Sequence, residues 1–367
     1  MRYLLLLLAL SFSLQASEIN FRKLSFKEGL AAAAKEGKPV FVDCFTTWCG
    51  PCKWMSANIF TDDAVAKYYN ENYVCLKIDM EKGEGIDIAK RYGIRAYPTL
   101  LYLDSEGEQL LVSVGAARNP QDYIDAGEQA KDPERNLVYL KANKEDNFEN
   151  LDFMSLYFET MSKANMVHTP EVEAFFQQFP TEQWLKPQLW EILQNVADDP
   201  NSSVFQEAYS QYNNFVARYE SDAEAFFDRC LFYGLANRLY RARNEEQKQA
   251  YQELKQQYLV PGHPATPKLR FRLSLLEAEK EKDWQKYGLL AMEGTEQFFN
   301  EAPTELNSVA WNVYEKVEDA EILKAAEKWA ARAVELDGSH HILDTYAHLL
   351  AKNGKTDQAL KWELKAF

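Results

Sequence analysis

The most constraining feature of the sequence is a pair of cysteines, two residues apart, placed between a strand and a helix. Residues 38–45 are β-branched and aromatic, which is typical of a buried strand. Soon after them, residues 48–53 read Trp-Cys-Gly-Pro-Cys-Lys and open a helical stretch. We therefore expect Cys49 at a helix N-terminus, with Cys52 one turn behind it and close enough for a disulfide to form.

A thiol at a helix N-terminus has distinctive chemistry. The unpaired backbone N–H groups there favour an anion, so we expect the pKa of the Cys49 thiol to lie well below the free value of about 8.5. The Cys49 thiolate can then attack a disulfide and form a mixed disulfide, which Cys52 resolves by attacking Cys49. Pro51 fits the first helical turn, because its missing N–H has no partner there.

Half of a zinc site is the competing interpretation of such a cysteine pair. A zinc site needs a second pair of ligands. Cys44, Cys75 and Cys230 are isolated in the sequence, and the 5 histidines form no matching pattern. We therefore expect no metal and no cofactor, and we interpret these three cysteines as separate buried thiols.

Residues 18–130 alternate between strand-like and helix-like stretches. Runs of β-branched and aromatic residues predict strands at 38–45, 73–79, 99–104 and 110–115. Helical patterns occupy 25–36, 52–70 and 86–92. This order, which ends in a hairpin, predicts an α/β domain whose mixed sheet carries helices on both faces.

Residues 131–367 differ in composition and predict an all-α domain. Long helical patterns dominate there, as at 202–219, 222–243 and 321–336. This region holds 27 basic and 39 acidic residues, whereas residues 17–130 hold 13 and 17. Asp132 precedes a proline and is therefore disfavoured in a helix, which makes it a plausible linker position.

The C-terminal end of the chain contains a short repeat. Its small and aromatic residues recur at an interval of 33, from Ala326, Trp329 and Ala333 to Ala359, Trp362 and Ala366. Over 306–367 the spacing resembles a tetratricopeptide repeat, although the period of that family is about 34 residues. The alternative is a generic set of antiparallel helices. In both cases the helices are expected to present a surface for a protein or peptide ligand.

The first 16 residues have the pattern of a signal peptide. They contain one positive charge, a short apolar run from Leu4 to Leu10, and Ala16 at the expected cut site. The apolar run is far shorter than the roughly 20 residues that a membrane span needs. We therefore expect an exported protein, periplasmic in a bacterium or otherwise secreted. A net charge of −15 argues against a nucleic-acid partner, which needs a basic surface.

Segment 48–53 resembles the active site of the thioredoxin family, and two further segments extend the resemblance. Residues 92–100 read Tyr-Gly-Ile-Arg-Ala-Tyr-Pro-Thr-Leu and are similar to the family segment that carries a cis-proline. The resemblance implies that Pro98 faces the two cysteines. It also implies a set of residues that contact substrate, namely Trp48, Gly50, Pro51, Tyr97, Pro98 and Gly115.

The resemblance also implies a third catalytic residue, Asp43. A buried aspartate of the family corresponds to it and is thought to relay a proton for the second cysteine, here Cys52. The family usually places a lysine on the neighbouring strand, where this sequence has Cys75. Lys77 lies on the same face, two residues further on, and is the candidate replacement. The loop at 80–87 is about four residues longer than in a minimal thioredoxin.

Three functions follow from these observations. The first is an exported thiol–disulfide oxidoreductase that reduces or exchanges disulfides of protein clients, because Gly50 and Pro51 resemble the dipeptide of reducing thioredoxins. It would need electrons from a membrane partner, because an oxidising compartment lacks cytosolic donors. The second is a disulfide oxidase or isomerase in protein folding. The third is a helical adaptor whose thioredoxin domain mainly binds partners.

Overall fold

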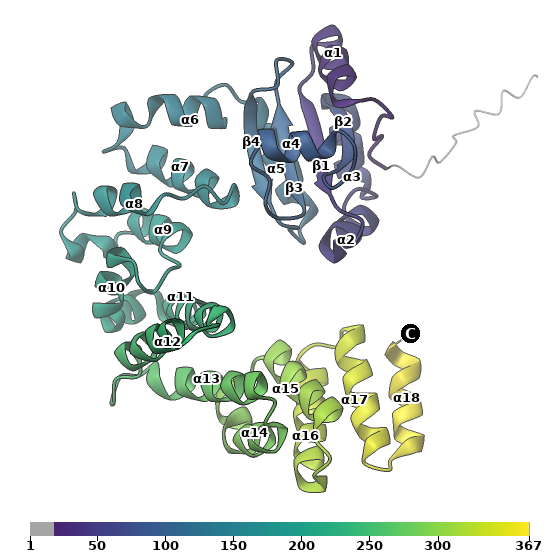
Figure 1. Ribbon diagram of the computed structural model, residues 1–367, viewed down its shortest axis with the longest axis vertical. Coiled ribbons are helices and arrows are strands. Elements are labelled where there is room, and N and C mark those ends of the chain that lie inside the picture. The colour runs from purple at the N-terminus through teal and green to yellow at the C-terminus, as the bar shows by residue number, and fades with distance from the viewer. Residues whose placement is uncertain (1–17, 367) are drawn as a thin grey trace, which may run out of the picture. The chain divides into compact units, whose positions relative to one another are not determined.

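A computed structural model describes residues 18–366 of the chain (Figure 1). The chain divides into two compact units, of which one ends at Val196 and the other begins at Ala197. The predicted signal peptide at 1–16 lies outside the described residues. Within 18–366, no helix combines the length and the apolarity that a bilayer crossing needs.

The N-terminal unit is built on a four-stranded mixed sheet, as the sequence predicts. Its strands are β1 (Val40–Phe45), β2 (Val74–Asp79), β3 (Thr99–Leu103) and β4 (Gln109–Val114). They lie in the order β2-β1-β3-β4, with β1 parallel to β2 and antiparallel to β3. Strands β3 and β4 form the predicted hairpin.

Helices cover both faces of this sheet. They are α1 (Phe26–Glu36), α2 (Gly50–Asn58), α3 (Asp63–Asn72), α4 (Gly85–Arg91) and α5 (Pro120–Lys131). On one face, α2, α3 and α5 contribute to an aromatic core that contains Phe41, Tyr69 and Tyr102. On the other face, α1 lies so close to β2 that a Cβ atom on Gly29 would be 2.5 Å from a methyl group of Leu76. The predicted α/β arrangement is therefore confirmed.

The single helix predicted at 52–70 is wrong, because the chain forms two helices there. Helix α2 ends at Asn58, and Asp62 begins α3 by accepting hydrogen bonds from the backbone N–H groups of Ala64 and Val65. This cap satisfies donors that have no partner inside the helix. The apolar pattern continues across the break, since both helices bury residues in the same core.

Further helices extend the N-terminal unit beyond the thioredoxin-like part. They are α6 (Leu137–Asn143), α7 (Leu151–Lys163), α8 (Thr169–Phe176) and α9 (Pro187–Val196), with short 3-10 turns η1 (Glu145–Asn147) and η2 (Thr181–Leu185). Helices α6 and α7 pack against β4. The boundary expected at 130/131 follows a change in composition, whereas the compact unit is defined by packing and continues to Val196.

The C-terminal unit is all helical over the residues described, as expected. Its helices are α10 (Ser203–Ser210), α11 (Tyr212–Arg241), α12 (Glu245–Tyr258), α13 (Thr266–Glu281), α14 (Trp284–Phe299), α15 (Pro303–Lys316), α16 (Ala320–Leu336), α17 (His340–Lys352) and α18 (Thr356–Ala366). Helix α11 is kinked at Glu220, where φ is 48°. The kink lies between the helices predicted at 202–219 and 222–243.

The repeat at the C-terminal end corresponds to successively packed helices. Helices α15, α16, α17 and α18 each contact the next in the chain. Ala326 and Ala333 of α16 are fully buried, and small side chains there let neighbouring helices approach closely. Gly354 separates α17 from α18 with a φ of 80°, a conformation that favours glycine. The assignment to the tetratricopeptide family stays a prediction.

Gly85 is a position where the N-terminal unit tolerates no side chain. A Cβ atom there would overlap the backbone oxygen of Asp79, which cannot move without disturbing the end of β2. We expect Gly85→Ala to lower the free energy of unfolding by about 2–4 kcal/mol, measured as a shift in the urea midpoint. Gly338→Ala is the control, since a Cβ atom added there would meet none of the described atoms within 4 Å. Equal midpoint shifts in the two variants would contradict this prediction.

Candidate active site

The cysteine pair lies at the N-terminus of α2, where the sequence places it. Cys49 is the residue that caps α2, and its Sγ atom accepts a hydrogen bond from the backbone N–H of Cys52 at 3.1 Å. The two cysteines are joined by a disulfide, with their Cα atoms 5.3 Å apart. Pro51 occupies the first turn of the helix. The arrangement provides an N–H donor for a Cys49 thiolate once the disulfide is reduced.

The residues around the disulfide differ in their exposure. Cys49 and Cys52 are both buried, whereas Gly50 and Pro51 are exposed on the turn between them. Trp48 is 65% exposed, which is unusual for a large aromatic side chain. A partner molecule would therefore meet Trp48, Gly50 and Pro51 before it reaches the sulfur atoms.

The predicted proline segment contacts Trp48, the residue that precedes Cys49. The Tyr97–Pro98 peptide bond is cis, and Pro98 is buried. The rings of Trp48 and Tyr97 meet edge to face, with their centroids 6.0 Å apart. The backbone N–H of Gly115 donates a hydrogen bond to the carbonyl oxygen of Pro98 at 2.9 Å. Trp48, Tyr97, Pro98 and Gly115, which come from three separate segments of the sequence, therefore form one connected group.

Glu81 joins this group, although no sequence pattern singles it out. Its Oε2 atom accepts a hydrogen bond from Nε1 of Trp48 at 2.9 Å. Glu81 belongs to the loop at 80–87. The expected length of that loop is the only feature of the sequence that points to a role for this segment. The contact holds the exposed indole ring in one orientation and adds a negative charge to the rim of the site.

Asp43 is fully buried and paired with Lys77. The two residues lie directly opposite each other on β1 and β2, and Lys77 Nζ is 2.6 Å from Asp43 Oδ2. Cys75, which corresponds to the family's lysine position, lies opposite Phe41 instead. Lys77 therefore supplies the cation, as the alternation of side chains along β2 suggested.

Lys77 also connects Asp43 to the helix that carries Cys52. Its ammonium group donates a second hydrogen bond to Ser56 Oγ at 2.7 Å. Ser56 in turn donates to the backbone carbonyl oxygen of Cys52 at 2.9 Å. A continuous chain of hydrogen bonds thus links the buried carboxylate to the turn that holds the second cysteine.

The environment of Asp43 favours its protonated form. Burial raises the pKa of the Asp43 carboxyl above its usual range, and the charge of Lys77 offsets this only in part. Oδ1 of Asp43 is buried and has no hydrogen-bond partner among the residues described. A carboxylate with a raised pKa and a free oxygen is chemically suited to accept a proton.

The other three cysteines are buried free thiols, as expected. Burial raises the pKa of the Cys75 and Cys230 thiols to about 12. It also raises the pKa of the Cys44 thiol well above its usual value. All three are therefore protonated and weakly nucleophilic at neutral pH.

One group of side chains in the described part of the chain has the proximity of metal ligands. Atoms of Asp344, His348 and Glu363, on α17 and α18, lie within 4.8 Å of one another. His348 Nδ1 is hydrogen-bonded to the backbone carbonyl oxygen of Asp344 at 2.9 Å. These residues belong to the C-terminal unit, whereas the cysteine pair belongs to the N-terminal unit.

Comparisons with known proteins agree with this geometry. A thioredoxin-like family model matches residues 21–105. Thioredoxin of Porphyra purpurea is 38% identical over 78 residues, which are 21% of this chain and 67% of that protein. Thiol:disulfide interchange protein DsbD of Yersinia pestis is 31% identical over 96 residues, or 25% of this chain and 16% of that protein. A solution structure of a candidate disulphide-isomerase from Bacteroides thetaiotaomicron is 50% identical, with a TM-score of 0.30, and the match covers 33% of this chain and 98% of that chain.

A mixed sheet, a cysteine pair at a helix N-terminus and a cis-proline beside it define the class of thioredoxin-like proteins. The chain belongs to the thioredoxin family through its N-terminal part. It spans about three-fifths of the length of other thioredoxins that it matches. The matched family segment contains Asp43, Cys49, Cys52 and Pro98, and it ends before Gly115.

Proposed function

We propose that the protein is an exported thiol–disulfide oxidoreductase that reduces or exchanges disulfides of protein clients. The observation that carries this proposal is the Cys49–Cys52 disulfide at the N-terminus of α2, in a domain that also holds a cis-peptide bond before Pro98. The relationship to thioredoxins supports the same chemistry.

The reaction begins with the reduced form of the pair. The Cys49 thiolate attacks one sulfur of a client disulfide, forms a mixed disulfide and releases the other client sulfur as a thiolate. Cys52 then loses its proton, attacks Cys49 Sγ and releases the second client thiol. The cycle leaves the client reduced and the Cys49–Cys52 disulfide oxidised, so an external reductant is needed before the next turnover.

Other residues of the site take supporting roles in this proposal. Asp43 accepts the proton of Cys52, for which its raised pKa and its unpartnered Oδ1 are suited. The exposed surface of Trp48, Gly50 and Pro51 contacts the client around its disulfide. Tyr97, Pro98 and Gly115 form the other side of the binding surface, where the backbone aligns the client chain, as the family resemblance implies.

The physiological direction of exchange is part of the proposal. We favour reduction, because the dipeptide Gly50-Pro51 lacks the histidine that stabilises the thiolate in strongly oxidising relatives. A disulfide oxidase or isomerase is the alternative. A reduction potential near about −270 mV, as in thioredoxin, would support reduction. A reduction potential near about −120 mV would support oxidation.

Export and the source of electrons are inferred together. The pattern of residues 1–16 favours secretion, and a reductase in an oxidising compartment needs electrons from elsewhere. We assign this task to a membrane electron donor. The similarity to a thiol:disulfide interchange protein is compatible with such a partner.

We assign client selection to the helical domain, residues 131–367. Its last part, 306–367, is proposed to be tetratricopeptide-like. Helices packed in series expose an extended surface, which suits a protein or peptide ligand. The alternative is that the protein acts as a helical adaptor, which binds partners without redox turnover.

Reduction of insulin by dithiothreitol tests the proposed activity directly. We expect the mature chain to accelerate the reaction by about a hundredfold or more, because its thiolate reacts faster than the small reductant. Cys49→Ser is expected to lose this acceleration completely, since the thiolate that makes the first attack is removed. The alternative adaptor role predicts no acceleration by the unmodified chain and full biological activity of Cys49→Ser.

A further inference from the structure

The C-terminal unit contains a small cavity formed by four of its helices. It has a volume of about 240 Å³ and lies between α11, α13, α14 and α15. Its polar lining includes Glu279 of α13 and Glu305 of α15, and its aromatic lining includes Tyr233 of α11 and Tyr287 of α14. All these residues belong to the same compact unit.

The cavity carries a net negative charge. Glu279 and Glu305 are each partly buried, and neither forms an ion pair within the described part of the chain. Burial raises the pKa of the Glu279 carboxyl, as expected where no cation stabilises the charge. The adjacent lysine, Lys280, donates its hydrogen bond to the carbonyl oxygen of Leu239 instead.

The cation that lines the cavity, Arg272, shares a carboxylate outside the cavity lining with a second cation, Lys268. Arg272 Nη1 is 2.5 Å from Asp228 Oδ2 and its side chain is nearly buried. Its guanidinium group lies over the ring of Phe232, 3.7 Å from the ring centroid. Lys268 Nζ lies 3.2 Å from the same Asp228 oxygen, so this group has two cations for one carboxylate. The two glutamates and Asp228 together still outnumber Arg272 and Lys268, which leaves a net negative charge. Phe232 already has a cation on one face.

Two tyrosine rings line the same cavity as the unpaired carboxylates. Tyr233 is 58% exposed at the cavity, and Tyr287 is buried in its wall. Asn312 donates a hydrogen bond to the hydroxyl oxygen of Tyr287 at 3.2 Å, which leaves the tyrosine hydroxyl free to donate. Tyrosine rings attract ammonium and guanidinium groups through their π electrons, and a nearby carboxylate strengthens this attraction.

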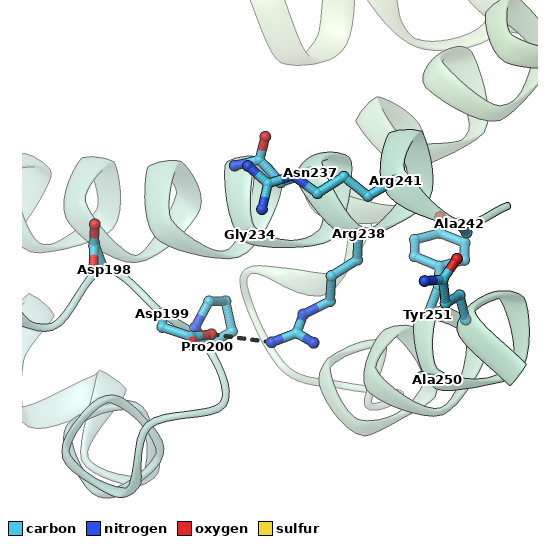
Figure 2. A pocket seen from close by; sticks show the side chains of 11 residues that line it. Asp198, Asp199, Pro200, Gly234, Asn237, Arg238, Arg241, Ala242, Ala250 and Tyr251 are labelled. Carbon is cyan, nitrogen blue, oxygen red and sulfur yellow. Dashed lines mark hydrogen bonds and ion pairs between the residues drawn. The ribbon is translucent and has the colours of Figure 1, made fainter. Parts of the chain in front are cut away.

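A larger cavity in the same unit lacks this imbalance (Figure 2). Its volume is about 440 Å³, and two aspartates and two arginines line it. Figure 2 shows Arg238 extending toward Asp199, with which it forms an ion pair of 3.2 Å. Equal numbers of opposite charges give no electrostatic reason for a charged ligand at that cavity.

We propose that the cavity bounded by Glu279, Glu305, Tyr233 and Tyr287 binds a lysine or arginine side chain of a partner polypeptide. The cationic group pairs with Glu279 and lies against the exposed ring of Tyr233. The C-terminal unit holds 28 acidic and 21 basic residues over 197–367, and this acidic excess supports a basic partner because it steers cations toward the unit. This inference concerns binding alone and does not depend on the redox chemistry of Cys49.

Fluorescence anisotropy of the mature chain tests the inference. The probe is a labelled glycine–serine peptide that carries two lysines, and its partner probe has both lysines acetylated. We expect the lysine peptide to bind and the acetylated peptide to bind at least about tenfold more weakly, because acetylation removes the charge. Glu279→Gln should weaken binding of the lysine peptide about tenfold, and Tyr233→Ala about threefold.

A matched variant shows whether binding depends on the cavity or only on the overall negative charge of the protein. Glu293→Gln removes the same charge from an exposed position on α14 and should leave binding unchanged. Equal binding of the two peptides, no binding of either, or equal weakening by Glu279→Gln and Glu293→Gln would each overturn the inference. Cys49→Ser should bind normally, so a failure of the proposed redox function would be seen separately.

Discussion

Replacing Cys52 with serine is expected to leave the client covalently attached to Cys49. The first attack needs only the Cys49 thiolate, whereas the release of the client needs the thiol at position 52. We expect the rate in the insulin assay to fall by about a hundredfold, to that of dithiothreitol alone, since the resolving nucleophile is absent. Mass spectrometry of the reaction without excess reductant should detect the mixed disulfide.

Two control variants test whether the adduct forms specifically on Cys49. Cys49→Ser should form no adduct, although it retains Cys52. Cys230→Ser should behave like the unmodified chain, because that thiol is buried in the C-terminal unit and has a raised pKa. An adduct on Cys49→Ser, or rapid client release by Cys52→Ser, would reverse the roles that we assign to the two cysteines.

Asp43→Ala is expected to slow the release of the client far more than the first attack. As a base, Asp43 accepts the proton that Cys52 must lose before it attacks Cys49. We expect the single-turnover release rate to fall by about a hundredfold, at the low end of the effect of a positioned general base. The rate of mixed-disulfide formation should change by no more than about threefold.

The pH dependence of release provides a second readout. Burial raises the pKa of Asp43, and only its deprotonated form accepts a proton. In the unmodified chain, release should therefore become slower as the pH falls through this raised pKa. Asp43→Ala should lose that dependence. A normal release rate in Asp43→Ala would contradict the proposed role.

Lys77→Met tests whether the charge of Lys77 sets the pH range in which Asp43 supports release of the client. Lys77 lowers the pKa of Asp43 and so opposes the effect of burial. Its removal should shift the pH profile of release toward higher pH, because the carboxylate then lacks its partner. An unchanged profile would indicate that Asp43 does not act as the base, even if Lys77→Met alters stability.

Local sequence patterns predicted the chemistry of the site well. The strand before Cys49, the proline at the start of α2 and the cis-proline segment all depend on residues close together in the chain. The strand and the place of Pro51 follow from local backbone preferences, whereas the cis-proline was expected from the resemblance to thioredoxins. For the same reason the four strands of the sheet were placed to within about two residues.

Contacts between distant segments were harder to predict. The pairing of Asp43 with Lys77 depends on the register of two strands that are separated by α2 and α3. The hydrogen bond from Trp48 to Glu81 depends on the path of a long loop. Register and loop path are decided by the packing of the whole unit, so a sequence pattern leaves several choices open.

The sequence alone determined that this chain carries a redox-capable cysteine pair on an α/β domain, followed by an acidic helical region. These conclusions depend on residue types and short spacings, which report local structure directly. Only the tertiary structure decided which cation pairs with Asp43 and where α2 ends and α3 begins. It also decided that Glu279, Glu305 and two tyrosines line one cavity. The physical reason is that burial and pairing depend on neighbours that the fold, and not the order of residues, brings together.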